Sequence, residues 1–210
     1  MKKLVQSLGW ASAVKVSSLA KLSFVVGSHM VWLSGPAIIT PLVGAFGGFF
    51  ASSIVLIIRM TVHFLLFKTL SLSFLAFCVP GFFGSLYWAT RSSVIRVFVP
   101  LICMALFIAH PVGGQAFVYS LYWLIPVALY FFGRNTIFMQ ALGSTFVVHA
   151  VGSVIWLYTV PMTAAMWLGL IPIVAVERLL FAVCMVVAYN AIVVVKNLAL
   201  LRVTKNIKFS

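Results

Sequence analysis

The chain has 210 residues, of which 64% are hydrophobic and 7% are charged, whereas soluble domains carry about 25% charged residues. A chain with this few polar side chains cannot cover the surface of a globule in water. The composition therefore excludes an ordinary soluble domain and indicates an integral membrane protein. Fourteen Lys and Arg oppose a single acid, Glu177. The basic residues stand singly or lie in the termini, which argues against nucleic acid and favours the anionic headgroups of a lipid bilayer as their partner.

The apolar segments are continuous runs and do not alternate with polar residues. A transmembrane β-barrel would alternate the two over strands of ~10 residues, whereas residues 97–109 are apolar throughout. We therefore predict an all-α, polytopic transmembrane helical bundle that forms one integral membrane domain over residues 1–210. At about 20 residues per span the chain has room for about six spans, against seven candidate apolar blocks.

The N-terminal segment, residues 1–21, is basic and only moderately apolar. Gly9, Ala13 and Ser17 recur in it every four residues and would share one helical face. Small residues on one face allow two helices to approach closely. We therefore predict a helix-packing role for these three residues.

Residues 22–58 carry no charge and are too many for one span. Breaks are expected at residues 34–36 and at Pro41, because proline lacks a backbone donor and disrupts a helix interior. Gly44 and Gly48 follow at GxxxG spacing, which predicts a second helix-packing face. Arg59 is expected to end the run.

Turn residues and basic residues together predict the topology of the later chain. Arg96 and Arg134 bracket one hairpin, so both are expected on the cytoplasmic side and the turn at residues 110–114 outside. A basic cytoplasmic tail, residues 196–210, ends the chain. Basic residues at both termini favour two cytoplasmic ends and an even number of crossings, hence six. The topology of the first half stays open. If Arg59, Lys68 and Arg91 are all cytoplasmic, residues 70–89 enter and leave the membrane on the same side. The apolar blocks after Lys68 are residues 70–89, 97–132, 136–176 with a turn at Pro161, and 179–195.

Glu177 and Arg178 are the most informative polar pair. Charge inside a membrane costs several kcal/mol and is usually retained for function. Adjacent residues on a helix point ~100° apart, so the two side chains are predicted not to face each other. Two interpretations remain open: one of them faces a cavity, or the pair anchors the end of its helix at the interface.

Four histidines could suggest a metal path, but none are spaced three or four residues apart and only one acid could assist them. We therefore predict no metal and no other cofactor. His149 is the best functional candidate, with Trp156 seven residues later on the same helical face. Trp123, Trp156, Tyr158 and Trp167 form either an aromatic belt at the membrane interface or the mouth of a pocket.

Catalysis and self-energised cation transport are both disfavoured. The sequence has no GxSxG, no HExxH and no paired carboxylates, so no enzyme and no catalytic residue are predicted. Ion-coupled transporters usually carry acidic residues within the membrane, and this chain offers one candidate. A substrate-capturing subunit that other proteins energise needs no such relay.

Several motifs in one order resemble the substrate-specific (S) components of energy-coupling factor transporters. They are YSLYWLIP at residues 119–126, a basic turn at Arg134, HAVGSVIW at residues 149–156, and LIP at residues 170–172 leading to ERLL at 177–180. Gly-Pro at residues 35–36 and PLVG at 41–44 resemble an earlier loop and helix start. The motifs cover roughly half of the chain.

The resemblance implies a six-helix membrane transport subunit that captures a small organic, vitamin-like micronutrient near the outer face. It also implies a membrane coupling subunit and ATPase subunits as partners. Residues 158–167 would form part of a lid. The candidate substrate-binding residues are His149, Trp156, Glu177, Arg178, His110 and Trp123. Two alternatives stay open: a structural or assembly membrane protein without substrate and, less favoured, an intramembrane enzyme.

Overall fold

The computed structural model describes residues 21–26, 29–69, 72–133 and 135–207. Gly9, Ala13 and Ser17, and with them the first predicted packing face, lie outside the described residues. Within the described residues the predicted helical character is confirmed, apart from one antiparallel hairpin of β1 (Lys21–Val26) and β2 (His29–Ser34). This hairpin occupies the start of the apolar run in which a helix was expected. Short apolar runs do not distinguish a strand from a helix by their periodicity.

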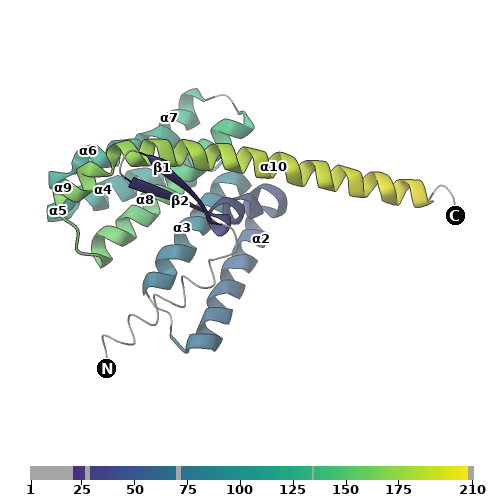
Figure 1. Cartoon of the computed structure of the whole chain (residues 1–210), viewed down its shortest axis with the longest axis horizontal. Coiled ribbons are helices and arrows are strands. Elements are labelled where there is room, and N and C mark those ends of the chain that lie inside the picture. Colours follow the sequence, from purple (N-terminus) through teal and green to yellow (C-terminus); the bar gives the residue numbers. More distant parts are fainter. Residues whose placement is uncertain (1–20, 27–28, 70–71, 134, 208–210) are drawn as a thin grey trace.

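The helices follow one another with short connections (Figure 1). Both turns predicted in the later chain are confirmed, because one helix ends at Ala109 and another at Thr159. In chain order the elements are α2 (Gly35–Phe67), α3 (Leu72–Ala89), the π-helical turn η1 (Val94–Phe98), α4 (Val99–Ala109), α5 (Pro111–Gln115), α6 (Phe117–Ser120), the 3-10 turn η2 (Leu121–Trp123), α7 (Leu124–Phe132), α8 (Ile137–Thr159), α9 (Ala164–Gly169) and α10 (Ile171–Ile207).

Helix α2 turns sharply at Gly48. The backbone of Gly48 has φ 66° and ψ −160°, a conformation that is essentially restricted to glycine. The guanidinium of Arg59 lies 3.3 Å from the hydroxyl of Thr40, although 19 residues of a straight helix would separate the two by about 28 Å. The helix therefore consists of two arms, residues 35–47 and residues 49–67. Arg59 does not end the apolar run as predicted but lies near the middle of the second arm. The break predicted at Pro41 is wrong, because Pro41 lies within the first arm and the helix turns at Gly48 instead.

The two glycines predicted to form a packing face have different surroundings. Gly44 lies against the backbone of Ser85 in α3 so closely that a Cβ atom at this position would overlap the Ser85 carbonyl group. The Cβ position of Gly48 has no atom within 4 Å. Gly44 thus permits the close approach of α2 and α3, whereas Gly48 forms a turn and makes no packing contact.

Helix α8 is the centre of the bundle. It contacts α3, α4, α7 and α10, and 56% of its most apolar segment is buried. Many of its residues are small, including Ala141, Gly143, Ser144 and Ala150, all of which are buried. Small side chains let several helices approach one axis, and this explains why α8 occupies the central position.

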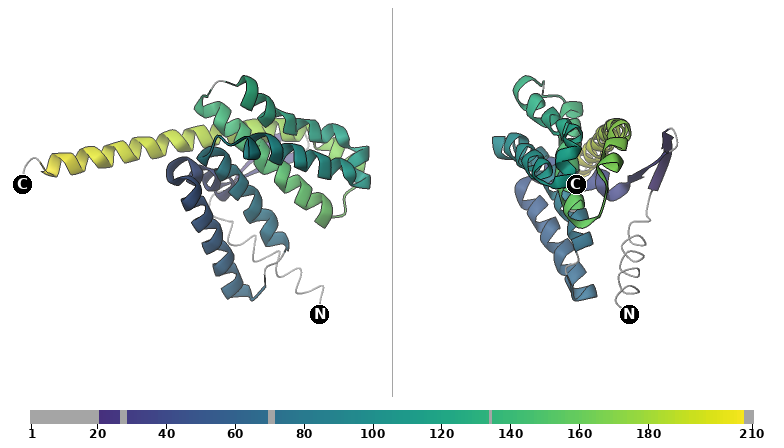
Figure 2. Two further views of the ribbon diagram at one scale, coloured as in Figure 1. Left: turned by 180° about the vertical axis from the view of Figure 1, so that it is seen from behind. Right: turned by 90° about the vertical axis from the view of Figure 1, so that its left-hand side faces the viewer.

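Helix α10 projects well beyond the other helices (Figures 1 and 2). It begins at Ile171 and continues past Lys196 to Ile207, so the predicted tail at residues 196–210 is helical over most of its length. Apolar side chains such as Val194, Val195 and Leu198 are more than half exposed on the projecting part. In the part of the chain that the structure describes, three helical segments are long and apolar enough to cross a membrane: Ala37–Phe67, Ile137–Thr159 and Ile171–Leu201.

Candidate functional site

A buried tyrosine and a histidine form the polar centre of the candidate site. The hydroxyl of Tyr119, on α6, lies 2.9 Å from Nε2 of His149 and 3.3 Å from the hydroxyl of Ser153. His149 and Ser153 are four residues apart on α8 and therefore share one face. Tyr119 is 1% exposed. A hydroxyl buried this deeply requires hydrogen-bond partners, and α8 supplies both.

Three aromatic rings surround Tyr119. Its ring centroid lies 5.6 Å from that of Phe107, 6.3 Å from Trp123 and 4.9 Å from Trp167. Phe107 also meets both indoles edge-on at 5.2 Å. Trp123 and Trp167 are 0% and 2% exposed, so the belt interpretation is wrong for these two residues. We call Phe107, Tyr119, Trp123 and Trp167 the aromatic cluster; it joins α4, α6, η2 and α9.

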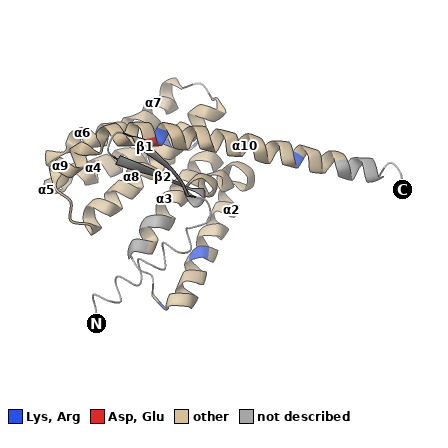
Figure 3. Cartoon of the chain, viewed as in Figure 1, with Lys and Arg blue, Asp and Glu red and all other residues tan. Residues whose placement is uncertain are grey.

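Glu177 and Arg178 form an ion pair beside this cluster. A terminal nitrogen of Arg178 lies 2.7 Å from a carboxylate oxygen of Glu177, so the prediction that the side chains do not face each other is wrong. The Cβ atoms of adjacent helical residues do point apart, but the long arginine stem can curve back. The arginine also lies over the ring of Phe181 at 4.7 Å, and Figure 3 shows the chain's single acid beside a basic residue on α10.

The charge of Arg178 reaches the polar centre of the site. Arg178 is near enough to act electrostatically on both His149 and Tyr119. Its side chain is 11% exposed, compared with 24% for Glu177. The pair therefore presents the positive group toward the bundle interior and the acid toward the more accessible side.

Three buried donors in this region have no hydrogen-bond partner among the described residues. They are Nε1 of Trp123, Nε1 of Trp167 and Nε of Arg178. A fourth, Nε1 of Trp88, belongs to a separate cluster in which Trp88 stacks on Tyr189. Buried donors without partners are rare in native proteins and call for an explanation such as a bound ligand or water.

The structure brings some of the predicted substrate-binding residues together and separates others. His149, Trp123, Glu177 and Arg178 all lie around Tyr119, and Trp156 is partly buried against the same core. His110 does not join them. Its Nδ1 accepts a hydrogen bond from the backbone of Val112 at the start of α5, and its ring meets Tyr158.

Sequence reasoning did not single out Tyr119, Ser153 or Phe107 as site residues. Ser153 could have been found, because it lies one helical turn after His149. Tyr119 and Phe107 gave no such signal, since their place depends on how α4 and α6 pack against α8. An aromatic residue in an apolar helix is not distinctive in a membrane protein.

A small pocket lies elsewhere, between the two arms of α2 and α3. Its lining includes Thr40, Ser52, Arg59, Cys78 and Ser85. None of the predicted substrate-binding residues contributes to it.

Comparisons of the chain with protein-family models, with curated proteins and with solved structures give no match. Any functional conclusion therefore rests on the residues themselves.

Proposed function

We propose that the chain is a multi-pass membrane subunit that captures a small organic molecule at the cluster around Tyr119. Partner proteins would energise its transport, as in the S components that the sequence resembles. The observation that carries the proposal is the group of unpaired buried donors, Trp123 Nε1, Trp167 Nε1 and Arg178 Nε. Buried donors without acceptors fit a ligand that brings its own acceptors, namely carbonyl or carboxylate oxygens.

The six spans that we propose start from Arg59 being a mid-helix residue, which leaves six helical segments as candidates. The six helical segments are the second arm of α2, α3, η1 with α4, α6 with α7, α8 and α10. Alternate crossings then place the connections at Arg91 and Arg134 on the same side as the basic C-terminal end, with Lys68 alone on the other. This distribution follows the positive-inside rule, with the C-terminal end cytoplasmic, and it removes the conflict in the first half.

The same topology places the candidate site toward the outer side. Tyr119 and Trp123 follow the outer connection at His110, and Trp167 lies in the next outer connection. His149 and Arg178 lie within the halves of α8 and α10 that adjoin it. A capture site near the outer side suits a subunit that takes its substrate from outside the cell.

The experiment that tests the proposal replaces one indole at a time with a phenyl ring, which removes the N–H group together with the five-membered part of the ring system. Ligands that co-purify with the protein in detergent are identified by mass spectrometry, and their affinities are then measured for Trp123→Phe and Trp167→Phe. Each donor hydrogen bond lost to a ligand costs about 0.5–1.5 kcal/mol, so we expect each variant to bind about threefold to tenfold more weakly.

Trp88→Phe is the matched control, because its indole N–H is also buried and unpaired but lies outside the cluster. It should leave ligand affinity unchanged. If no small molecule accompanies the purified protein, or if the three variants bind it alike, capture at this cluster is refuted.

A structural or assembly role is the second candidate. The projecting part of α10 favours it, because apolar side chains such as Ile192, Val195 and Leu198 are exposed there among the described residues. A partner whose loss lowers the abundance of this protein, with no ligand effect, would support that role. Removal of residues 191–207 should then prevent assembly while leaving the cluster around Tyr119 intact.

A further inference from the structure

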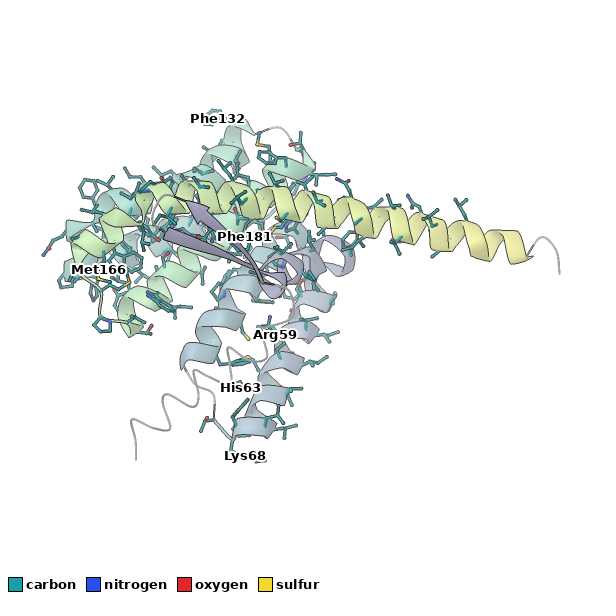
Figure 4. The ribbon with its side chains drawn as sticks, viewed as in Figure 1. Arg59, His63, Lys68, Phe132, Met166 and Phe181 are labelled. Atoms are coloured by element: carbon teal, nitrogen blue, oxygen red, sulfur yellow. The ribbon has the colours of Figure 1, made fainter. Side chains whose placement is uncertain are left out.

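The pocket between α2 and α3 contains a cation in mostly apolar surroundings. Arg59 lines it together with the polar groups of Thr40, Ser52, Cys78 and Ser85. The remaining walls are apolar: Val43, Val55, Leu56 and Phe82. The pocket is partly open and has room for little more than one water-sized group. Figure 4 shows Arg59 partway along the second arm of α2, above His63 and Lys68.

Arg59 has fewer partners than the other two arginines that are at least partly buried. Arg178 has the carboxylate of Glu177 at 2.7 Å. Arg96 donates to the carbonyl oxygens of Tyr87 and Thr90 and to Oε1 of Gln140, at 2.8–3.2 Å. Among the described residues Arg59 has one hydrogen bond, to the hydroxyl of Thr40. A guanidinium has five N–H donors, so most of those on Arg59 are available to a ligand.

The chain has no side-chain acid to neutralise Arg59. Its single Asp or Glu is Glu177, which already pairs with Arg178. In the proposed membrane placement of α2, Arg59 lies about 15 Å from residue 49 and about 12 Å from residue 67. A bilayer core is about 30 Å thick, so the guanidinium lies deep in a medium where an unpaired charge is costly.

We propose that this pocket binds the carboxylate of a monocarboxylic acid. A carboxylate matches the planar fork of the guanidinium with two parallel hydrogen bonds, and it would approach Arg59 from the open side of the pocket. The hydroxyl of Thr40 accepts from Arg59 and still has its own hydrogen to donate. The acid is either an apolar one dissolved in the bilayer, such as a fatty acid, or a short one from water.

The test uses the full-length protein in nanodiscs of phosphatidylcholine, whose headgroup carries no net charge. Laurate and acetate, each with a ¹³C-labelled carboxyl group, are titrated at pH 8, where both are ionised in water. We expect a saturable shift of the carboxyl resonance. Arg59→Gln should weaken binding at least about tenfold, since a charge-assisted pair is lost. Arg91→Gln, at an exposed position in the α3–η1 connection, should bind as the unaltered protein does.

The two acids distinguish the sources of the ligand. Binding of laurate that excess acetate does not displace assigns the site to an apolar acid from the bilayer, whereas Arg59-dependent binding of acetate assigns it to a short acid from water. If Arg59→Gln does not fold, Thr40→Val decides, with an expected loss of about threefold to tenfold. The proposal is overturned if neither acid binds saturably, or if the decisive variant binds like the unaltered protein.

Discussion

Arg59 donates a hydrogen bond to Thr40 across a turn within one helical element, with 3.3 Å between the two atoms. Gly48 makes this contact possible, because its positive φ reverses the direction of α2. The contact has two consequences. It places the guanidinium of Arg59 in the α2–α3 pocket. It also means that Arg59 is not a loop residue, so its charge does not help to determine which side of the membrane a loop occupies.

Replacing Gly48 with alanine should destabilise the protein by strain alone. Gly48 has φ 66° and ψ −160°, and a residue with a Cβ atom adopts this backbone conformation at a cost of about 1–3 kcal/mol. The measurement is the free energy of unfolding in detergent, from denaturant titration. Gly169→Ala is the control, because the Cβ position of Gly169 is also open and its φ is not positive; it should change stability by less than about 0.5 kcal/mol. Equal effects of the two substitutions would show that the turn does not depend on glycine.

Gly44→Ala should be more damaging than its small volume suggests. The new Cβ atom would overlap the carbonyl group of Ser85, and a backbone atom cannot rotate away as a side chain can. Overpacking of this kind typically costs about 1–3 kcal/mol and occasionally more. The matched control is Gly152→Ala, whose Cβ atom would meet Pro80 at an ordinary 3.6 Å. Thermal unfolding of both variants in the same detergent would separate the two cases, and a Gly44→Ala variant as stable as the control would contradict the close approach of α2 and α3.

The sequence predicted the elements that depend on local chemistry. The turns after Ala109 and Thr159 follow from proline and glycine, and the helix that begins at Gly35 follows from the Gly-Pro break. The turn at Gly48 was not predicted, because GxxxG spacing serves both helix packing and turns. The β1–β2 hairpin was not predicted either, because its two six-residue strands are too short for hydrophobic periodicity to distinguish a strand from a helix.

The candidate site could be predicted only in part, for a related reason. His149, Glu177 and Arg178 are recognisable because polar groups are rare in this chain. Tyr119 and Phe107 became site residues only through the packing of α4 and α6 on α8. The ion pair of Glu177 with Arg178 depends on side-chain length and rotamer, which helical spacing does not determine.

Arg96 should contribute more to stability than its neighbour Arg91. It is 8% exposed, joins the end of α3 to Gln140 of α8, and lies over the ring of Tyr87 at 4.4 Å. Arg96→Met would remove the donor from the carbonyl oxygens of Tyr87 and Thr90 and from Oε1 of Gln140. The bond to Tyr87 is buried, so its loss alone should cost about 1–3 kcal/mol. Arg91→Met, at an exposed position, should cost less than about 0.5 kcal/mol. Denaturant titration of both variants measures this, and equal losses would mean that the Arg96 contacts carry no net stability.

The proposed six-span topology predicts opposite accessibility for two neighbouring connections. In a background without Cys78, Cys103 and Cys184, a cysteine at Thr69 should react with a membrane-impermeant maleimide in intact cells. A cysteine at Ser92 should react only after permeabilisation, because one crossing separates the two positions. The cysteine-free parent gives the labelling background. Reaction of both positions under the same condition would show that α3 does not cross the membrane.

Tyr119→Phe tests the polar centre of the candidate site. The substitution removes the hydroxyl, so His149 and Ser153 each lose their hydrogen bond to Tyr119. Because the site is buried, the expected loss of stability is about 1–3 kcal/mol. Tyr158→Phe is a matched control, since its hydroxyl donates to the carbonyl oxygen of Leu106 at 2.9 Å on an exposed surface, where water can replace the tyrosine hydroxyl; its loss should stay below about 1 kcal/mol. A larger loss for Tyr158→Phe than for Tyr119→Phe, measured by denaturant titration, would contradict a satisfied hydrogen-bond cluster at Tyr119.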